Sequence, residues 1–191
     1  MSRTDDLYAF AYRGLLARQA IADLHEPQSS HKKATHIASR LPLSLLDESV
    51  VHAAQEMAVV YAAIAAFENA AREFIEKRLL EEVGSDWWEK CVPEKRRLKA
   101  ESRRDEENRV RWHAQRGESP LQYTEMEDLS AIIVTNPERF VSIIQDPEWA
   151  KGIFKTVERS RNIIMHSGYL EAEDIERLGM ALRDWLAQIG G

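Results

Sequence analysis

Cysteine, glycine and proline are scarce in this 191-residue sequence, which contains one cysteine, eight glycines and six prolines. The single cysteine, Cys91, cannot form an internal disulfide and excludes a cysteine-rich zinc site, which is typical of proteins in a reducing cytoplasm. The longest uninterrupted apolar run, AVVYAAIAAF, is too short to span a bilayer, and the first residues form no basic and apolar leader. We therefore expect a soluble cytoplasmic protein with no membrane partner.

Sequence motifs for cofactors, metals and common catalytic machineries are also missing. The chain has no Gly-rich phosphate loop, no His-Glu-x-x-His, no Gly-x-Ser-x-Gly and no Cys-x-x-Cys. His31 and His36 have a spacing that no common metal motif uses, so solvated loop histidines are the simpler interpretation. We expect neither a metal nor a cofactor. The net charge of −6 argues against extensive coating of nucleic acid but permits a local basic patch.

Apolar residues recur at helical spacing along most of the chain, and alternation at strand spacing is essentially absent, which predicts an all-α protein. The expected helices cover residues 4–24, 44–83, 94–116 (a highly charged helix or arm), 148–166 and 173–189, with shorter helices punctuated by Pro120, Pro137 and Pro147. Gly84 is the expected C-cap of the longest helix, and residues 25–42 are expected to form a polar linker. We divide the chain into an N-terminal helix and linker, residues 1–40, and a helical domain, residues 41–191.

An arginine interrupts the apolar face of the helix expected at residues 148–166. At about 100° per residue, Arg161 shares this face with Ala150, Ile153, Phe154, Val157 and Ile164. The long helix has a similar face, with Glu68 in its middle, that comprises Val50, Ala54, Met57, Tyr61, Ile64, Ala71, Ile75 and Leu79. Because arginine is rarely buried without a partner, we expect Glu68, with Asn69, to orient Arg161 through a bidentate pair between the helices. An ion pair that only sets helix register would leave the same pattern.

A histidine, His166, ends the same helix and is followed by Ser-Gly. A continued helix would point His166 about 140° away from Arg161, but an end at Ser167 and Gly168 lets the imidazole turn towards the arginine. Histidine at a helix exit suits proton transfer, although a histidine that only complements the helix dipole would look the same. Asn162 lies one turn before His166 and offers a neutral donor to a phosphate. The three side chains together are typical of a phosphate-handling site that needs no metal.

Three short motifs, AAFENAAREFIEKRL, YTEMEDLSAII and RNIIMH, follow one another along the helical part of the chain. They resemble, in turn, the Glu-Asn-x-x-Arg helix, a Tyr-x-x-x-x-Asp-Leu-x-x-Ile-Ile element and the Arg-polar-x-x-x-His motif of the HEPN superfamily, the higher eukaryotes and prokaryotes nucleotide-binding domains. The similar branch occurs in mRNA-quality-control endonucleases and in bacterial defence and toxin systems. The resemblance covers residues 43–191, and the first forty residues lie outside it.

This resemblance implies an up-and-down helical bundle of HEPN type, with an additional N-terminal helix, that usually forms a homodimer. Active HEPN members are metal-independent endoribonucleases in which the ribose 2′-hydroxyl attacks the adjacent phosphate. By resemblance, Arg161 would bind that phosphate of the RNA substrate and His166 would transfer a proton. The supporting residues would be Asn162, Glu68, Asn69 and Arg72.

A composite site in the homodimer follows from the geometry of this reaction. The attacking 2′-hydroxyl and the departing 5′-oxygen lie on opposite sides of phosphorus, so one imidazole cannot easily exchange protons with both. A second copy of the motif, from the other subunit, would supply the missing group. The expected protein is a toxin or phage-defence ribonuclease, controlled by an antitoxin or a fused regulatory partner.

The segment 94–116 is locally basic on an acidic chain, with nine basic residues against five acidic ones. It could follow an RNA backbone, with an aromatic side chain stacked on a base. The candidate RNA-binding residues are Arg103, Arg104, Arg109, Arg111 and Trp112. The mixed charges equally suit an ordinary solvated helix, and Trp87 and Trp88 are more simply packing anchors than base-stacking residues.

A second class of function stays open at this point. The domain could be a catalytically silent helical module that dimerises or binds RNA or protein, with Arg161 and Glu68 as a structural pair. The two hypotheses separate under substitution, because only a nuclease would lose RNA cleavage in a His166→Ala variant.

Overall fold

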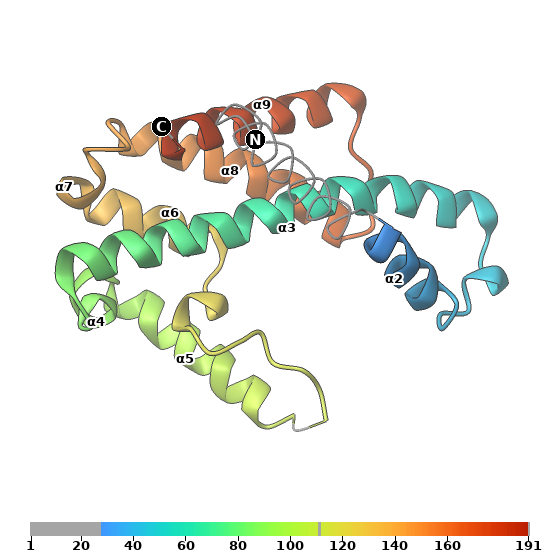
Figure 1. Cartoon of the computed structure of the whole chain (residues 1–191), viewed down its shortest axis with the longest axis horizontal. Coiled ribbons are helices and arrows are strands. Elements are labelled where there is room, and N and C mark those ends of the chain that lie inside the picture. Colours follow the sequence, from blue (N-terminus) through green and yellow to red (C-terminus); the bar gives the residue numbers. More distant parts are fainter. Residues whose placement is uncertain (1–27, 111, 191) are drawn as a thin grey trace, which may run out of the picture. The chain divides into compact units, whose positions relative to one another are not determined.

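Helices form all of the regular structure in the described part of the chain, so the predicted all-α class is confirmed. The computed structural model in Figure 1 describes residues 28–110 and 112–190, with side chains from residue 33 onwards. The chain divides into two compact units, Met1–Val51 and His52–Gly191. The helix expected over residues 4–24 lies outside the described residues.

A helix replaces most of the linker that the sequence predicts for residues 25–42. Helix α2 covers Gln28–Ala38, and a short 3-10 helix, η1, covers Leu43–Leu45. The linker prediction is wrong because α2 contains lysines and alanines but neither glycine nor proline, and such a composition favours a helix even when it is polar.

The longest helix, α3, spans Glu48–Val83. It begins later than the apolar pattern predicts, because the carboxylate of Asp47 accepts hydrogen bonds from the hydroxyl and the backbone N–H of Ser49 and so caps the helix. These hydrogen bonds also lower the pKa of Asp47. The predicted C-cap is confirmed, since Gly84 has φ +81° and its N–H donates to the carbonyl of Leu80 at 2.9 Å.

One face of α3 belongs to the core of the second unit. Its buried side chains are Met57, Ile64, Phe67, Ala71, Ile75 and Leu79, which confirms most of the predicted stripe. Val50, Ala54 and Tyr61 are exceptions and stay exposed. The buried part of the stripe begins only at Met57, and Tyr61 borders an open hollow.

The composition of α3 would also suit a membrane span. An 18-residue window has a mean hydropathy of 1.5, so by length and composition alone this helix is long and apolar enough to cross a bilayer. Core helices of soluble proteins can have the same composition. In α3, 17% of this apolar stretch is buried, on the side that packs within the helical bundle.

Two short helices and one charged helix follow α3: α4 at Trp87–Cys91, α5 at Glu94–Asn108 and the 3-10 helix η2 at Pro120–Tyr123. Trp87 and Trp88 are buried and their rings meet edge to face at 5.5 Å, so their interpretation as packing anchors is confirmed. The charged helix was expected to reach residue 116. It ends earlier because valine, tryptophan, histidine and glycine in residues 109–117 favour a helix less.

The remaining helices are α6 at Met126–Thr135, α7 at Pro137–Phe140, α8 at Pro147–Met165 and α9 at Ala172–Ile189. Helix α8 packs against both α6 and α9, and α8 and α9 run antiparallel in Figure 1. The fully buried Trp185 of α9 meets the rings of Phe67 and Phe74 from α3 and of Phe154 from α8, at centroid distances of 5.1–5.8 Å. This aromatic cluster positions α8 against α3.

Candidate active site

A hollow of about 470 Å³ is lined by α3, α8 and the segment around η2. Four residues that the sequence predicts to act together line it: Glu68, Asn69, Arg72 and Arg161. Tyr61, Arg116, Gln122, Thr124, Glu125 and Met165 complete the wall. The fold therefore brings the Glu-Asn-x-x-Arg motif of α3 and the arginine of α8 to one place. We call this space the Arg161 hollow.

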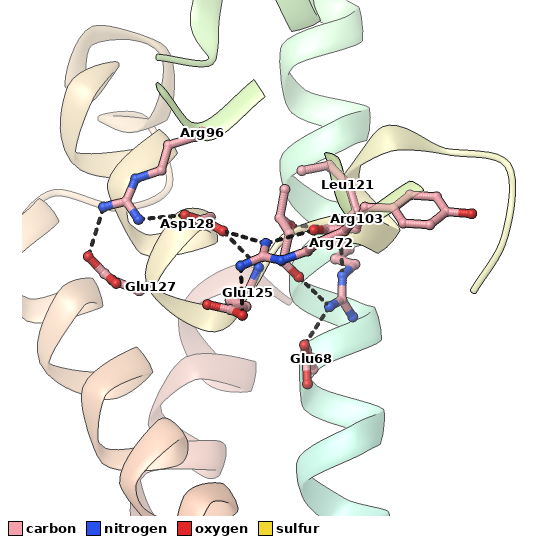
Figure 2. A network of polar contacts seen from close by, with 10 residues as sticks. Glu68, Arg72, Arg96, Arg103, Leu121, Glu125, Glu127 and Asp128 are labelled. Atoms are coloured by element: carbon pink, nitrogen blue, oxygen red, sulfur yellow. Dashed lines mark hydrogen bonds and ion pairs between the residues drawn. The ribbon is translucent and has the colours of Figure 1, made fainter. Parts of the chain in front are cut away.

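The expected ion pair between Glu68 and Arg161 is not formed. Glu68 instead binds the guanidinium of Arg72, one turn along the same helix (Figure 2). Arg72 also donates to the carbonyl oxygens of Leu121 at 3.0 Å and Thr124 at 3.1 Å. Two residues four apart on one helix are already neighbours, whereas a pair with Arg161 depends on how α3 and α8 cross. Glu68 therefore pairs with Arg72 rather than with Arg161. Arg72 thus ties α3 to the η2 turn.

Arg161 is half-buried, and within the described residues its side chain forms neither a hydrogen bond nor an ion pair. The carboxylate of Glu158 lies one turn earlier on α8. Burial raises the pKa of Glu158, and the positive charge of Arg161 partly opposes this rise. A guanidinium that faces an open hollow without a carboxylate partner can bind an anion there.

His166 stands at the C-terminal cap of α8, where the helix ends as predicted. Ser167 takes φ +61°, and the N–H of Gly168 donates to the carbonyl of Ile163 at 2.8 Å. The imidazole is exposed and is not among the side chains that line the Arg161 hollow, and Asn162 is exposed as well. Within one chain the structure therefore joins Arg161 to the α3 residues but leaves His166 and Asn162 outside.

A buried carboxylate that the sequence did not indicate forms an ionic cluster near the site. Asp128 is fully buried and accepts from Arg96 at 2.5 Å, from Arg103 at 3.4 Å and from the backbone N–H of Glu125 at 3.0 Å. Figure 2 shows the two arginines approaching Asp128 from opposite sides. The capping box at the start of α6 was the available signal, because Asp128 is its third helical residue.

Arg103, a predicted RNA contact, has its partners inside the fold. Its guanidinium pairs with Glu125 at 2.7 Å and with Asp128, and it also donates to the carbonyl of Tyr123. An arginine held by two carboxylates has little left to offer a phosphate. Its role is to attach α5 to the start of α6.

The other candidate RNA contacts differ in their surroundings. Arg104 and Arg109 are exposed, and Trp112 is 86% exposed. Arg111 lies outside the described residues. Arg116, which was not singled out from the sequence, reaches the Arg161 hollow from the segment after α5. No cluster of metal-ligating side chains occurs among the residues that the structure describes.

A sequence model of the family described as Swt1-like HEPN matches residues 62–190. The match covers more than half of the chain and includes both the α3 motif and the Arg161 to His166 motif. No curated protein and no solved structure matches the chain.

Proposed function

Because the chain belongs to the Swt1-like HEPN family, we propose that it is a metal-independent endoribonuclease of toxin or defence type. HEPN domains are nucleotide-binding modules, and many of them are ribonucleases. An effector of this kind acts on RNA in the cytoplasm and needs restraint in its own cell. An antitoxin or a fused regulatory partner therefore belongs to the same proposal.

The observation that carries the proposal is the free guanidinium of Arg161 in its hollow. Three arginines line this space. Arg72 pairs with Glu68 and Arg116 with Glu107, whereas Arg161 forms no ion pair among the described residues, although its charge acts on the Glu158 carboxylate one turn earlier. Two parallel N–H groups of a guanidinium match two oxygens of a phosphate. Placed there, Arg161 would bind the scissile phosphate and stabilise the charge that develops as the 2′-hydroxyl attacks.

Proton transfer is assigned to His166. The reaction removes a proton from the 2′-hydroxyl and delivers one to the departing 5′-oxygen, and these two atoms lie on opposite sides of phosphorus. His166 is exposed at the exit of α8 and outside the hollow of its own chain. A two-fold axis close to this exit would bring two copies of the motif together. We therefore assign the active site to a homodimer, with Arg161 and His166 supplied by both copies.

Exposed apolar side chains around the exit of α8 support self-association there. Ile163, Met165 and Tyr169 are 41%, 56% and 51% exposed. Met165 lines the Arg161 hollow together with Tyr61, which is 42% exposed, so this patch continues onto α3. Several exposed apolar side chains gathered at one helix exit are typical of an interaction site.

A charge introduced into this patch is expected to separate the dimer. A Tyr169→Asp variant should sediment as a monomer at concentrations where the wild type is a dimer, and RNA cleavage should fall at least tenfold, because a carboxylate is costly to bury at an interface. Met180→Asp is the matched control, since Met180 is 52% exposed on α9. Full cleavage by a strictly monomeric wild type would contradict the composite site.

Product chemistry tests the reaction itself. Total RNA incubated with the purified protein in excess chelator is expected to be cut at the same rate as without chelator, because the proposed nucleophile is the ribose hydroxyl and not a metal-bound hydroxide. The new ends should be a cyclic phosphate and a free 5′-hydroxyl, which phosphorylation and ligation assays distinguish. Ends that carry a 5′-phosphate, or cleavage that stops in chelator, would overturn the mechanism.

A further inference from the structure

An exposed tryptophan marks the segment that joins α5 to η2. Trp112 is 86% exposed, while Trp87, Trp88 and Trp185 are buried and Trp149 is half-buried. Its ring meets that of His113 edge to face at 5.6 Å, and no ring of the described residues stacks on the faces of the indole. A large aromatic surface in water is unfavourable, so an exposed indole of this kind points to a binding partner.

Arg116 connects this segment to the Arg161 hollow. It lines that hollow and also a second one of about 430 Å³, whose other lining residues are Arg103, Glu106, Glu107, Val110, His113 and Ala114. Glu107 holds Arg116 in place by an ion pair to its Nε at 2.6 Å and by a hydrogen bond from its backbone N–H at 3.2 Å. The Arg116 side chain is 50% exposed, and the ion pair to Glu107 uses only its Nε, so the two Nη groups can still donate at the junction of the two hollows.

We propose that Arg116 and Trp112 form a subsite for the nucleotide next to the scissile phosphate. Arg116 binds the neighbouring phosphate, and Trp112 stacks on the base attached to it. The inference rests on the proposed function and deepens it, because it names the substrate class as single-stranded RNA that extends at least one nucleotide beyond the cut.

The charges around the two hollows determine which part of the nucleotide goes where. Glu106 and Glu107 line the second hollow and repel a phosphate, so the backbone contact is confined to Arg116 at the junction. Trp112 adjoins this second hollow through His113, which lines it and whose ring meets the indole at 5.6 Å, and the indole offers a flat apolar surface to the base. Stacking requires a base that is free of its partner strand, which excludes an intact duplex. Arg104 and Arg109 are exposed nearby in sequence and add attraction that salt screens.

Binding is measured with the His166→Ala protein, so that the RNA stays intact. The probe is a labelled single-stranded oligouridylate of about ten nucleotides, within the usual range of single-strand site sizes. In this His166→Ala background, Trp112→Ala is expected to raise the Kd for the oligouridylate about tenfold. The stacking of one base strengthens binding by a factor of about 5 to 150. Trp112→Phe should restore most of the affinity because it keeps an aromatic face. Arg116→Ala should weaken binding and lower the salt dependence, whereas Arg177→Ala, an exposed arginine of α9, should change neither.

Each outcome separates the subsite from the nuclease. Unchanged affinity in the Trp112→Ala protein, or equal affinity for the same RNA in a duplex, overturns the subsite. A change in sedimentation of this variant would place Trp112 in a protein interface and would also overturn it. Cleavage by the wild type with no Trp112 dependence leaves the proposed function standing without the subsite. Trp112-dependent binding without any cleavage by the wild type leaves the subsite standing and removes the nuclease.

Discussion

A His166→Ala variant is expected to lose RNA cleavage by a factor of about 10² to 10⁴, the usual contribution of a positioned acid or base. The fold should not change, because the imidazole is exposed and forms no hydrogen bond within the described residues. The growth arrest expected when the wild type is produced in cells should disappear in the same variant. The measurements are initial rates on total RNA, thermal unfolding and sedimentation, the last two being expected to match the wild type.

His52→Ala is the matched control for this experiment. His52 is an exposed histidine of α3 that faces Glu56 at 3.6 Å and does not line the Arg161 hollow. Its removal should leave cleavage unchanged. If His166→Ala cleaves as fast as the wild type, His166 transfers no proton. If the wild type itself never cleaves RNA, the chain is the silent helical module, and the position of His166 outside its own hollow is then the feature that explains it.

Asp128→Ala is expected to destabilise the protein by about 3–5 kcal/mol, the usual effect of breaking a buried ion pair from one side. The Asp128 side chain is 1% exposed, while Arg96 and Arg103 are only 19% and 20% exposed. Removing the carboxylate leaves two half-buried guanidinium groups facing each other across its former position. Half of the α6 capping box is lost as well, since the Asp128 carboxylate accepts the backbone N–H of Glu125.

Urea unfolding measures this loss, and Glu127→Ala is its control. Glu127 also pairs with Arg96, at 2.8 Å, but its side chain is 63% exposed, so its removal should cost less than about 1 kcal/mol. The hydrogen bond from Arg96 lowers the pKa of Glu127 in the folded protein. The small stabilisation by this pair is therefore complete above the ordinary pKa of a glutamate and is lost as the pH falls through the lowered pKa. If Asp128→Ala lowers the free energy of unfolding by less than about 1 kcal/mol, water must solvate the two guanidinium groups that the carboxylate bound.

Local chemistry made much of the fold and part of the site predictable. Gly84 ends α3, and Ser167 with Gly168 ends α8, because the left-handed backbone at these positions depends on neighbouring residues only. The α3 motif and Arg161 line one hollow, as the sequence predicted. Both interrupt the apolar face of a helix, and such faces pack together in a core. The α2 helix was missed because its polar composition conceals ordinary helix propensity.

The identity of each charged partner was not predictable in this way. Glu68 could reach Arg72 by itself, but whether it would reach Arg161 depended on how two helices cross. Asp128 and Arg103 lie 25 residues apart, and nothing local connects them. Arg116 enters the site only because the segment after α5 folds back towards α3.

The amino-acid sequence by itself determined the helical class, the main helix ends and the family motifs, since propensity, capping and apolar periodicity act over a few neighbouring residues. Only the tertiary structure decided that Arg103 ties α5 to α6, that Arg161 forms no ion pair among the described residues and that His166 lies outside the hollow of its own chain. Ion pairs form within a few ångströms, so a charged side chain finds its partner only after packing has placed the helices.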